Sequence, residues 1–312
     1  MKDKPLISVV LPTYNGSEFI SQSINSIINQ TYTNWELIIV NDCSTDNTAE
    51  IIQTFAQKDS RIRVLTNEVN KKLPASLNVG FKQAQGEYYT WTSDDNEYYP
   101  QAFEKMVDFL QNNDDYGMVY AQTNVEENGV LQNYLWCTEK TTPELLLQIS
   151  VPGACFLYKA DVAKLVGEYD VSIFLNEDHD YWLRLFLVSK IGNLNETLYL
   201  YRLRKNNLTN LRQNDIQKGK LALLRKYRKI YAKHFEGINE YFKHEICVDN
   251  FVEGQISFEE VRKTVPKEIL YKLLKKEVIL TKNFELISKI KSLGFIYFLK
   301  AVKLKYKYGV EK

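Results

Sequence analysis

The sequence predicts an α/β protein with a Rossmann-like, mostly parallel sheet, followed by a helical C-terminal extension. Short β-branched runs alternate with helical patterns over residues 6–113, which is typical of parallel strands joined by right-handed crossovers. Hydrophobic residues make up 45% and charged residues 25% of the 312 residues, close to average globular composition, so a disordered or fibrous chain is excluded. Beyond residue 240 the segments are helical in pattern and rich in lysine.

Four strand–helix pairs are expected in the first part of the chain. In each pair an apolar run ends at turn or cap residues, and a segment with apolar residues at helical spacing follows. The strands are predicted over 6–11, 36–42, 61–67 and 87–96, and the helices over 19–30, 49–57, 73–85 and 101–113. The strand ends read PTYN, NDCS, TN and SDDN, so polar residues collect where parallel sheets bind ligands.

The middle of the chain is less regular and indicates an α+β region joined to the first sheet. Strands are expected over 118–125, 153–159 and 198–204, a turn at Gly129, and helices over 143–150, 177–191 and 213–235. The region of Gly237 is the best candidate boundary, which gives one domain over 1–236 and a helical, basic region over 237–312.

Several functional classes lose their main support. No apolar run approaches the ~20 residues of a membrane span, and the start MKDKPLISVV lacks a signal-peptide core, so we expect a cytoplasmic protein. The four cysteines and three histidines lack the spacing of a zinc site or a disulfide framework. The loop PTYNGS is neither GxGxxG nor a Walker A sequence, and no GxSxG occurs, which argues against dinucleotide binding, P-loop chemistry and serine hydrolysis.

Asp94 and Asp95 are the first chemical signal. Neighbouring side chains of an extended segment point to opposite faces, so one carboxylate can bind a hard cation while the other acts elsewhere. Mg²⁺ or Mn²⁺ held by one or two carboxylates keeps coordination positions for diphosphate oxygens. The alternative is a simple Ser-Asp-Asp-Asn turn, which for an isolated pair is at least as common.

Four ordered segments resemble family 2 glycosyltransferases with the GT-A fold. They are SVVLPTYNGSEFISQSINSIINQTY, ELIIVNDCSTDNT, LPASLNVGFKQAQGEYYTWTSDDN and EDHDYWLRL, and the resemblance covers residues 6–202. It implies a nucleotide-diphospho-sugar transferase fold in which residues 1–117 bind the nucleotide sugar and residues 118–236 bind the acceptor.

The resemblance also implies roles for single residues on the donor side. Asp42 is implied to contact the nucleotide base, with Tyr14 packed beside it. Asp94 is implied near the ribose, and Asp95 as the direct ligand of a divalent cation, Mn²⁺ or Mg²⁺. For Lys72 a solvated loop is the alternative to a contact with the diphosphate. The residues expected to bind the donor are Pro12, Thr13, Tyr14, Asn15, Asp42, Lys72, Asn78, Asp94 and Asp95.

Three departures from the usual family pattern stand out. Asn41 and Cys43 flank Asp42, where the family usually has Asp-Asp-Gly-Ser. Thr92 stands where a further Asp is frequent, and Leu77 where an Arg often precedes the Asn. The first and third changes bear on the identity of the nucleotide, and the second leaves fewer carboxylates for a metal.

Asp178 is the catalytic base that the resemblance implies. It starts a predicted helix, where the positive end of the dipole favours an ionised carboxylate, although a simple N-cap is the alternative. One base without a carboxylate nucleophile implies direct displacement and inversion. Glu177, Trp182 and Arg202 are expected on the acceptor side. Core packing is nevertheless the commoner role for Trp182, and Arg202 and Arg204 also match a family position near the phosphates.

The charge is unevenly divided along the chain. Residues 1–201 hold 14 Lys and Arg against 27 Asp and Glu, whereas residues 202–312 hold 26 against 12. Residues 286–308 read as an amphipathic basic helix. Two interpretations are open for this helix: peripheral contact with an anionic membrane, or docking on the catalytic domain or on a second copy in a homo-oligomer. Nucleic acid is not an expected partner.

The sequence therefore predicts an inverting, metal-dependent hexosyltransferase. It would move a sugar from a nucleotide diphosphate, expected to be UDP, to a hydroxyl of a glycan or lipid-linked glycan of a bacterial capsule or lipopolysaccharide. The alternative from another class is a catalytically inactive GT-A-like nucleotide-binding or scaffold protein, which need not keep Asp95 and Asp178. A nucleotidyltransferase is a third option, weakened by the absence of a Gly-rich loop near the N-terminus.

Overall fold

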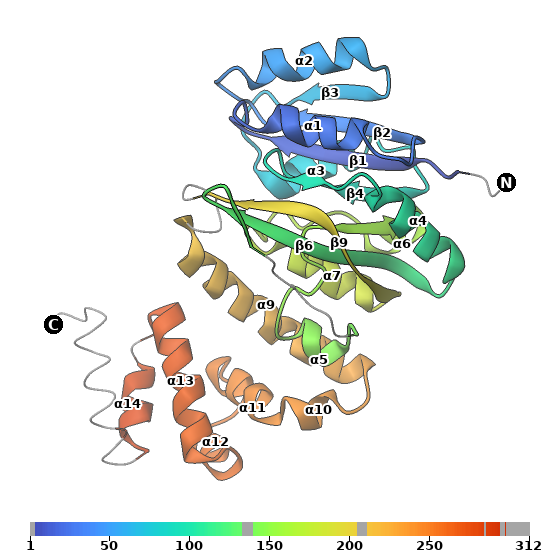
Figure 1. Ribbon diagram of the computed structural model, residues 1–312. Coiled ribbons are helices and arrows are strands. Elements are labelled where there is room, and N and C mark those ends of the chain that lie inside the picture. Colours follow the sequence, from blue (N-terminus) through green and yellow to red (C-terminus); the bar gives the residue numbers. More distant parts are fainter. Residues whose placement is uncertain (1–3, 133–139, 205–210, 284, 294–296, 298–312) are drawn as a thin grey trace. The chain divides into compact units, whose positions relative to one another are not determined.

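The computed structural model describes residues 4–132, 140–204, 211–283, 285–293 and 297 (Figure 1). The chain forms two compact units, of which the first ends at Leu211 and the second begins at Arg212. The boundary expected after residue 236 falls instead inside the second unit. The reason is that α9 (Gln213–His234) packs against the helices that follow it rather than closing the first unit.

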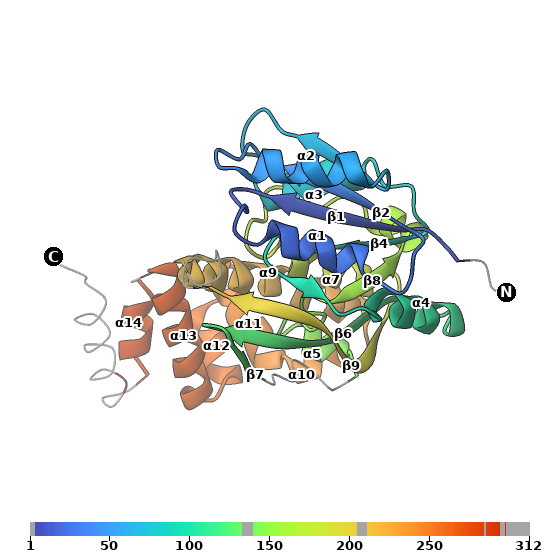
Figure 2. The same ribbon diagram turned by 45° about the horizontal axis from the view of Figure 1, so that its top comes forward.

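Nine strands of the described part of the chain form one mixed sheet in the first unit. They are β1 (Ile7–Thr13), β2 (Trp35–Asn41), β3 (Ile62–Thr66), β4 (Tyr88–Trp91), β5 (Glu97–Tyr98), β6 (Tyr116–Glu127), β7 (Val130–Gln132), β8 (Phe156–Lys159) and β9 (Lys190–Leu203). Their order is β3-β2-β1-β4-β8-β6-β9-β5, with β7 paired to β6. The first four strands are parallel, and β6 and β9 are parallel over most of their length (Figure 2). This architecture confirms the predicted α/β fold of the GT-A type.

Helices cover both faces of this sheet. They are α1 (Ile20–Ile28), α2 (Thr48–Lys58), α3 (Leu73–Phe81), α4 (Ala102–Asn112), α5 (Pro143–Leu146), α6 (Ala160–Val166) and α7 (Glu177–Phe186). α1, α2 and α4 pack on one face, and α3 lies on the opposite face of β1 and β2. Gly80 allows α3 to come this close, because a Cβ there would lie 2.4 Å from Cγ1 of Val10.

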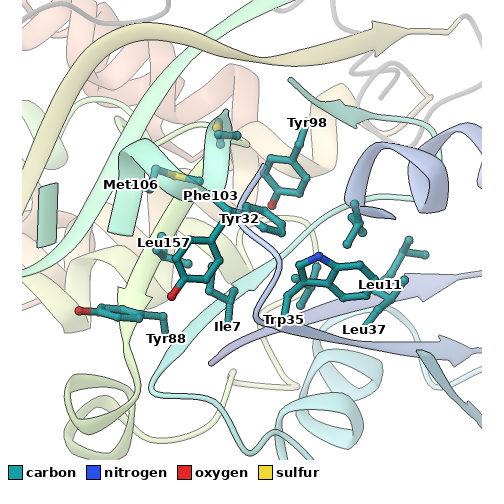
Figure 3. Packing of buried hydrophobic residues seen from close by; sticks show 14 of the residues in the cluster. Ile7, Leu11, Tyr32, Trp35, Leu37, Tyr88, Tyr98, Phe103, Met106 and Leu157 are labelled. Atoms are coloured by element: carbon teal, nitrogen blue, oxygen red, sulfur yellow. The ribbon is translucent and has the colours of Figure 1, made fainter. Parts of the chain in front are cut away.

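The main core lies between the sheet and the helices α1, α2 and α4 (Figure 3). Ile7 and Leu11 are four positions apart in β1, so both point to the same face of the sheet. There they pack in one cluster with Trp35 of β2 and with Phe103 and Met106 of α4. Each such fully buried side chain contributes roughly 1.5–3 kcal/mol. This core fixes the strand register, and with it the positions of the residues that follow the strand ends.

Several predicted elements differ in extent from the structure, among them the two expected to hold Asp94, Asp95 and Asp178. The strand expected over 87–96 ends as β4 at Trp91, because the backbone N–H of Thr92 makes the last bond to β1 and the chain then turns. The helix expected over 177–191 ends at Phe186, and β9 already begins at Lys190. Pairing with β6 overrides the helical pattern of this segment.

The second unit is helical in its described residues. Besides α9 it contains α10 (Ile238–Tyr241), α11 (Lys243–Val252), α12 (Phe258–Thr264), α13 (Lys267–Thr281) and α14 (Leu286–Lys291). Its core includes Leu270, Leu274 and Val278 of α13 together with Leu286 and Ile290 of α14. None of the described helices is long and apolar enough to span a membrane.

Parts of two sequence-based predictions lie outside the described residues. Of the predicted helix over 286–308, only the first part is described, and its apolar residues Leu286, Ile290 and Leu293 are buried in the core of the second unit. Cys137 also lies outside the described residues, whereas Cys43, Cys155 and Cys247 are free thiols.

Candidate active site

The candidate site lies at the carboxyl edge of the sheet, where β1 adjoins β4. From β1 the chain proceeds to β2 through α1 on one face, and from β3 it returns to β4 through α3 on the other. Such a reversal of strand order opens a ligand crevice beyond the strand ends. Thr13 ends β1 and Asp94 follows β4, and the Thr13 hydroxyl donates a hydrogen bond of 2.6 Å to Oδ2 of Asp94. The structure thus brings these two predicted residues together.

Asp94 is a partly buried carboxylate. Burial raises its pKa to about 6, whereas the hydrogen bonds from Thr13 and from the backbone of Tyr14 act in the opposite direction. The backbone at Gly16 passes directly over this carboxylate, since a Cβ there would lie 2.2 Å from Oδ2 of Asp94. Gly16 therefore has a packing role at the site that its position in a predicted turn did not reveal.

Asp95 is paired with an arginine. Nε and Nη2 of Arg204 lie 3.0 and 2.7 Å from Oδ2 of Asp95, and the Arg204 side chain is 36% exposed. Arg202 also supports this turn, because Nη1 donates to the backbone oxygen of Asp95 at 2.8 Å and Nη2 pairs with Glu97. Arg202 is thus engaged in fixing the turn around Asp95 and is not free to bind an acceptor.

The carboxylates fit a divalent cation that receives most of its ligands from a substrate. Within the described residues, no group of three or more His, Cys, Asp and Glu side chains converges on a possible metal position. Mg²⁺ and Mn²⁺ are commonly held by one or two carboxylates plus substrate phosphates, and Asp95 with the adjacent Asp94 supplies such a set. A cation bound at Oδ2 of Asp95 would compete with Arg204 for that oxygen.

Asp42 organises the loops beside the crevice. It follows β2, and its Oδ1 accepts hydrogen bonds from the Asn67 side chain at 2.7 Å and from the Lys71 backbone at 2.8 Å. Its Oδ2 accepts the backbone N–H of Lys72 at 2.8 Å. Asn67 was not predicted as a site residue, although its place directly after a strand was the signal that could have found it.

Of the other residues expected to bind the donor, some have exposed side chains and others make contacts within the protein. Tyr14 is 51% exposed and can stack on a planar group, whereas Pro12 is buried at the end of β1. Asn15 joins two loops, because its backbone N–H donates to Oγ of Ser44 at 3.0 Å and its Oδ1 accepts the backbone N–H of Thr45 at 2.8 Å. Lys72 is exposed, and its Nζ lies 4.9 Å from the ring centre of Phe174.

Asn78, which was expected to bind the donor, has its side-chain amide engaged with the protein backbone. Its Nδ2 donates to the backbone oxygen of Tyr169 and its Oδ1 accepts the backbone N–H of Tyr169, both at 2.8 Å. These two bonds use the side-chain amide to join α3 to the segment that leads into α7.

Glu177 and Asp178 begin α7. Oδ1 of Asp178 accepts the backbone N–H of His179 at 2.7 Å, and the Ser150 hydroxyl lies 3.4 Å from Oδ2. Glu177 is buried, and its Oε2 has no hydrogen-bond partner among the described residues. Burial, followed by the charge of Asp178, raises the pKa of Glu177 to about 8. Glu177 is therefore mostly protonated at neutral pH.

Trp182 belongs to the core and is not an acceptor platform. Its side chain is fully buried and packs edge-on against Phe156, with ring centres 4.6 Å apart. A ring in this position cannot stack on a sugar. The periodicity of the helix already favoured this role, because Trp182 shares a face with other apolar residues of α7.

Glu177→Gln is expected to change how stability depends on pH. The folded-state pKa lies above the ordinary value, so the free energy of unfolding of the wild type should fall as pH rises from about 4.5 to about 8. The amide does not titrate, so the variant should not show this decline. Between pH 5 and pH 8 the free energy of unfolding of the variant should therefore rise relative to that of the wild type by up to a few kcal/mol, since one pKa unit corresponds to ~1.4 kcal/mol. Chemical denaturation at both pH values measures the effect, with exposed Glu168→Gln as the control. Parallel profiles of wild type and Glu177→Gln would contradict it.

Comparisons with known proteins agree with the fold. The profile of glycosyl transferase family 2 matches residues 8–165. An uncharacterized glycosyltransferase of Rickettsia prowazekii is 30% identical over 260 residues, which cover 78% of this chain and 79% of that protein. The putative teichuronic acid biosynthesis glycosyltransferase TuaG of Bacillus subtilis is 28% identical over 235 residues, or 74% of this chain and 91% of that protein.

A solved structure supports the same fold. The crystal structure of S. aureus TarS 1-349 in complex with UDP-GlcNAc superposes with a TM-score of 0.58 at 18% sequence identity. The match covers 90% of this chain and 83% of that one. At this level of identity the likeness concerns the fold alone.

Proposed function

Because the chain belongs to glycosyl transferase family 2 and is a glycosyltransferase, we propose that it transfers a sugar from a UDP-sugar to a hydroxyl of a bacterial surface glycan, with inversion. The observation that carries this proposal is the meeting of Thr13, Asp94 and Asp95 at the point where the strand order reverses. The glycan or lipid-linked acceptor belongs to the proposal, and the relationship to TuaG supports a surface polysaccharide.

Three features support a nucleotide-diphosphate donor at this edge. Exposed Tyr14 offers a stacking surface at the end of β1. Asp95 provides a carboxylate for a divalent cation, Mn²⁺ or Mg²⁺, and Arg204 is a cationic side chain that the same cation would release toward phosphate oxygens. The complexes of TarS with UDP and UDP-GlcNAc support UDP as the first nucleotide to test.

The proposed chemistry is one direct displacement. The acceptor hydroxyl gives its proton to the Asp178 carboxylate while its oxygen forms a bond to the anomeric carbon. The bond between that carbon and the diphosphate oxygen breaks, and the diphosphate leaves with the electron pair. A bound divalent cation supplies electrostatic stabilisation of this leaving group. Asp178 acts as general base, a contribution worth roughly 10²–10⁴-fold in rate.

A donor-hydrolysis screen tests this function. UDP-, GDP- and dTDP-sugars are incubated with the protein and Mn²⁺ or Mg²⁺, and release of the free nucleotide is measured. Turnover of a UDP-sugar with a divalent cation, abolished by EDTA, is the expected result. Nucleotide binding without turnover would favour the catalytically inactive binding protein, and neither binding nor turnover would refute the proposal.

A further part of the proposal concerns the membrane. Residues 298–312, which lie outside the described residues, hold five lysines and one glutamate. Basic segments bind anionic lipid with about 1 kcal/mol per lysine near the surface. The described start of the predicted basic helix is buried in the core of the second unit, so the residues after Tyr297 are the segment to test.

Truncation after Tyr297 is expected to abolish salt-sensitive binding to vesicles with anionic headgroups. This variant keeps Leu286, Ile287 and Ile290 in the core, whereas removal of residues 286–312 would also damage the fold. Sedimentation with anionic and neutral vesicles at low and high salt measures the effect. A full-length variant with the five lysines changed to Gln is matched to the truncation, because it removes the charge and keeps the length of the chain. If the intact protein ignores anionic vesicles at low salt, the C-terminal segment is structural or oligomeric.

A further inference from the structure

Tyr169 lies at a junction of three elements that carry or support the site. Its backbone is bound on both sides by the Asn78 side chain of α3, with two bonds of 2.8 Å. Its hydroxyl accepts a 3.0 Å hydrogen bond from Nε1 of Trp91, the last residue of β4. Its ring stacks on Tyr181 of α7, with ring centres 4.1 Å apart and planes inclined by 15°. The contacts thus reach α3, β4 and α7 through one residue.

Each of these partners is close in sequence to a site residue. Trp91 precedes Asp94 by three residues, and Tyr181 follows Asp178 by three residues, which is about one helical turn. A displacement of Tyr169 would therefore move the start of α7 relative to the end of β4. Burial chiefly raises the pKa of the Tyr169 hydroxyl, with the charge of Asp178 acting in the same direction, so the hydroxyl stays protonated.

The segment between Tyr169 and α7 is held in a strained form. Leu175 has a φ of 73°, a conformation that a leucine rarely adopts. Such backbone persists only where the surrounding structure holds it, and it is common at active sites. Lys72, which directly precedes α3, also contacts this segment, because its Nζ lies 4.9 Å from the ring centre of Phe174.

We propose that Asn78 and Tyr169, the Asn78–Tyr169 clamp, are positioning residues that set the place of Asp178 relative to Asp94 and Asp95. This inference rests on the proposed role of Asp178 as the base. It assigns to Asn78 a function in transfer that does not require contact with the donor. A misplacement of about 1 Å can cost ~10²-fold in rate, so a clamp acting through three elements is large enough to matter.

Two substitutions break the clamp in different ways. Tyr169→Phe removes the bond from Trp91 and keeps the ring that stacks on Tyr181. Asn78→Ala removes both bonds to the Tyr169 backbone. Both variants should lose transfer rate, by about tenfold or more, because the base no longer meets the acceptor hydroxyl in the required geometry. The affinity for UDP should not change, since neither side chain is proposed to touch the nucleotide.

A double-substitution experiment separates positioning from general damage. Tyr169→Phe combined with Asp178→Asn should be no slower than Asp178→Asn alone, because both act through the same base. Tyr32→Phe is the matched control, since it removes one buried tyrosine hydrogen bond, 2.6 Å to the backbone oxygen of Pro5. The control should transfer sugar at the wild-type rate.

The outcomes distinguish this inference from the function on which it rests. Wild-type kcat in both Tyr169→Phe and Asn78→Ala would overturn the clamp, provided that Asp178→Asn has lost transfer. Losses that multiply in the double variant, or a fall in UDP affinity equal to the fall in kcat, would also overturn it. Wild-type transfer by Asp178→Asn would instead refute the proposed base.

Discussion

Replacement of Asp178 by Asn is expected to reduce sugar transfer by ~10²–10⁴-fold, the usual contribution of a general base. The amide keeps the local structure, since its oxygen can still accept the backbone N–H of His179 and its NH₂ group can donate to Ser150. Only the ability to take a proton disappears. Donor binding should therefore be preserved, and kcat should fall without a rise in the Kd for UDP.

Asp161→Asn is a closely matched control for this variant. Asp161 is the second residue of α6, as Asp178 is of α7, and its Oδ1 also accepts the next backbone N–H at 2.7 Å. Both variants thus lose a carboxylate from the start of a helix, but only Asp178 is proposed to act in the site. Stopped or quenched assays of transfer with both proteins decide the question. Transfer by Asp178→Asn at the rate of the control would show that the base lies elsewhere.

Replacement of Asp95 by Asn is expected to remove the metal-supported part of donor binding. An amide is a weaker ligand than a carboxylate for a hard cation. Loss of a group that merely orients a metal ligand costs about 10–100-fold in metal affinity, so loss of the ligand itself should lower UDP affinity in Mn²⁺ by at least about tenfold. The substitution also removes the ion pair of 2.7 Å between Arg204 and Asp95, while Glu18 stays 3.8 Å from the guanidinium.

Calorimetric titration with UDP in Mn²⁺ and in EDTA isolates the effect. In EDTA the variant should bind UDP at least as well as the wild type, because the cation makes no contribution there and the carboxylate of residue 95 no longer competes with phosphate for Arg204. Asp115→Asn is the control, since it also breaks an ion pair with a basic residue, the exposed contact of 2.6 Å to Lys190. Equal dependence on Mn²⁺ in Asp95→Asn and in the wild type would contradict the assignment of Asp95.

Much of the fold could be predicted because local pattern and tertiary role agree there. Each of the first four strands is an apolar run whose register is fixed by a buried core, so the residues after the strands fall at one edge. The meeting of Thr13 with Asp94 follows from this edge alone. The helix expected up to residue 191 failed because β9 gains its stability from pairing with β6, which no local pattern records.

The structural contacts of three residues expected at the site could not be predicted, for a related reason. Asn78, Arg202 and Trp182 lie in segments that match the family, yet their partners are far away in the chain. Asn78 binds the backbone of Tyr169, and Arg202 holds the turn at Asp95. A motif gives the place of a side chain along the chain, but whether its polar atoms are free for a substrate depends on such long-range contacts.

The stereochemistry of the product decides whether one carboxylate base drives a direct displacement. Proton NMR of the first sugar formed from the UDP-α-sugar that the donor screen identifies, recorded before mutarotation, reports the anomeric configuration. Direct displacement should give the β-anomer from the α-linked donor. First formation of the α-anomer would contradict it, because retention needs a second displacement that a single base cannot provide.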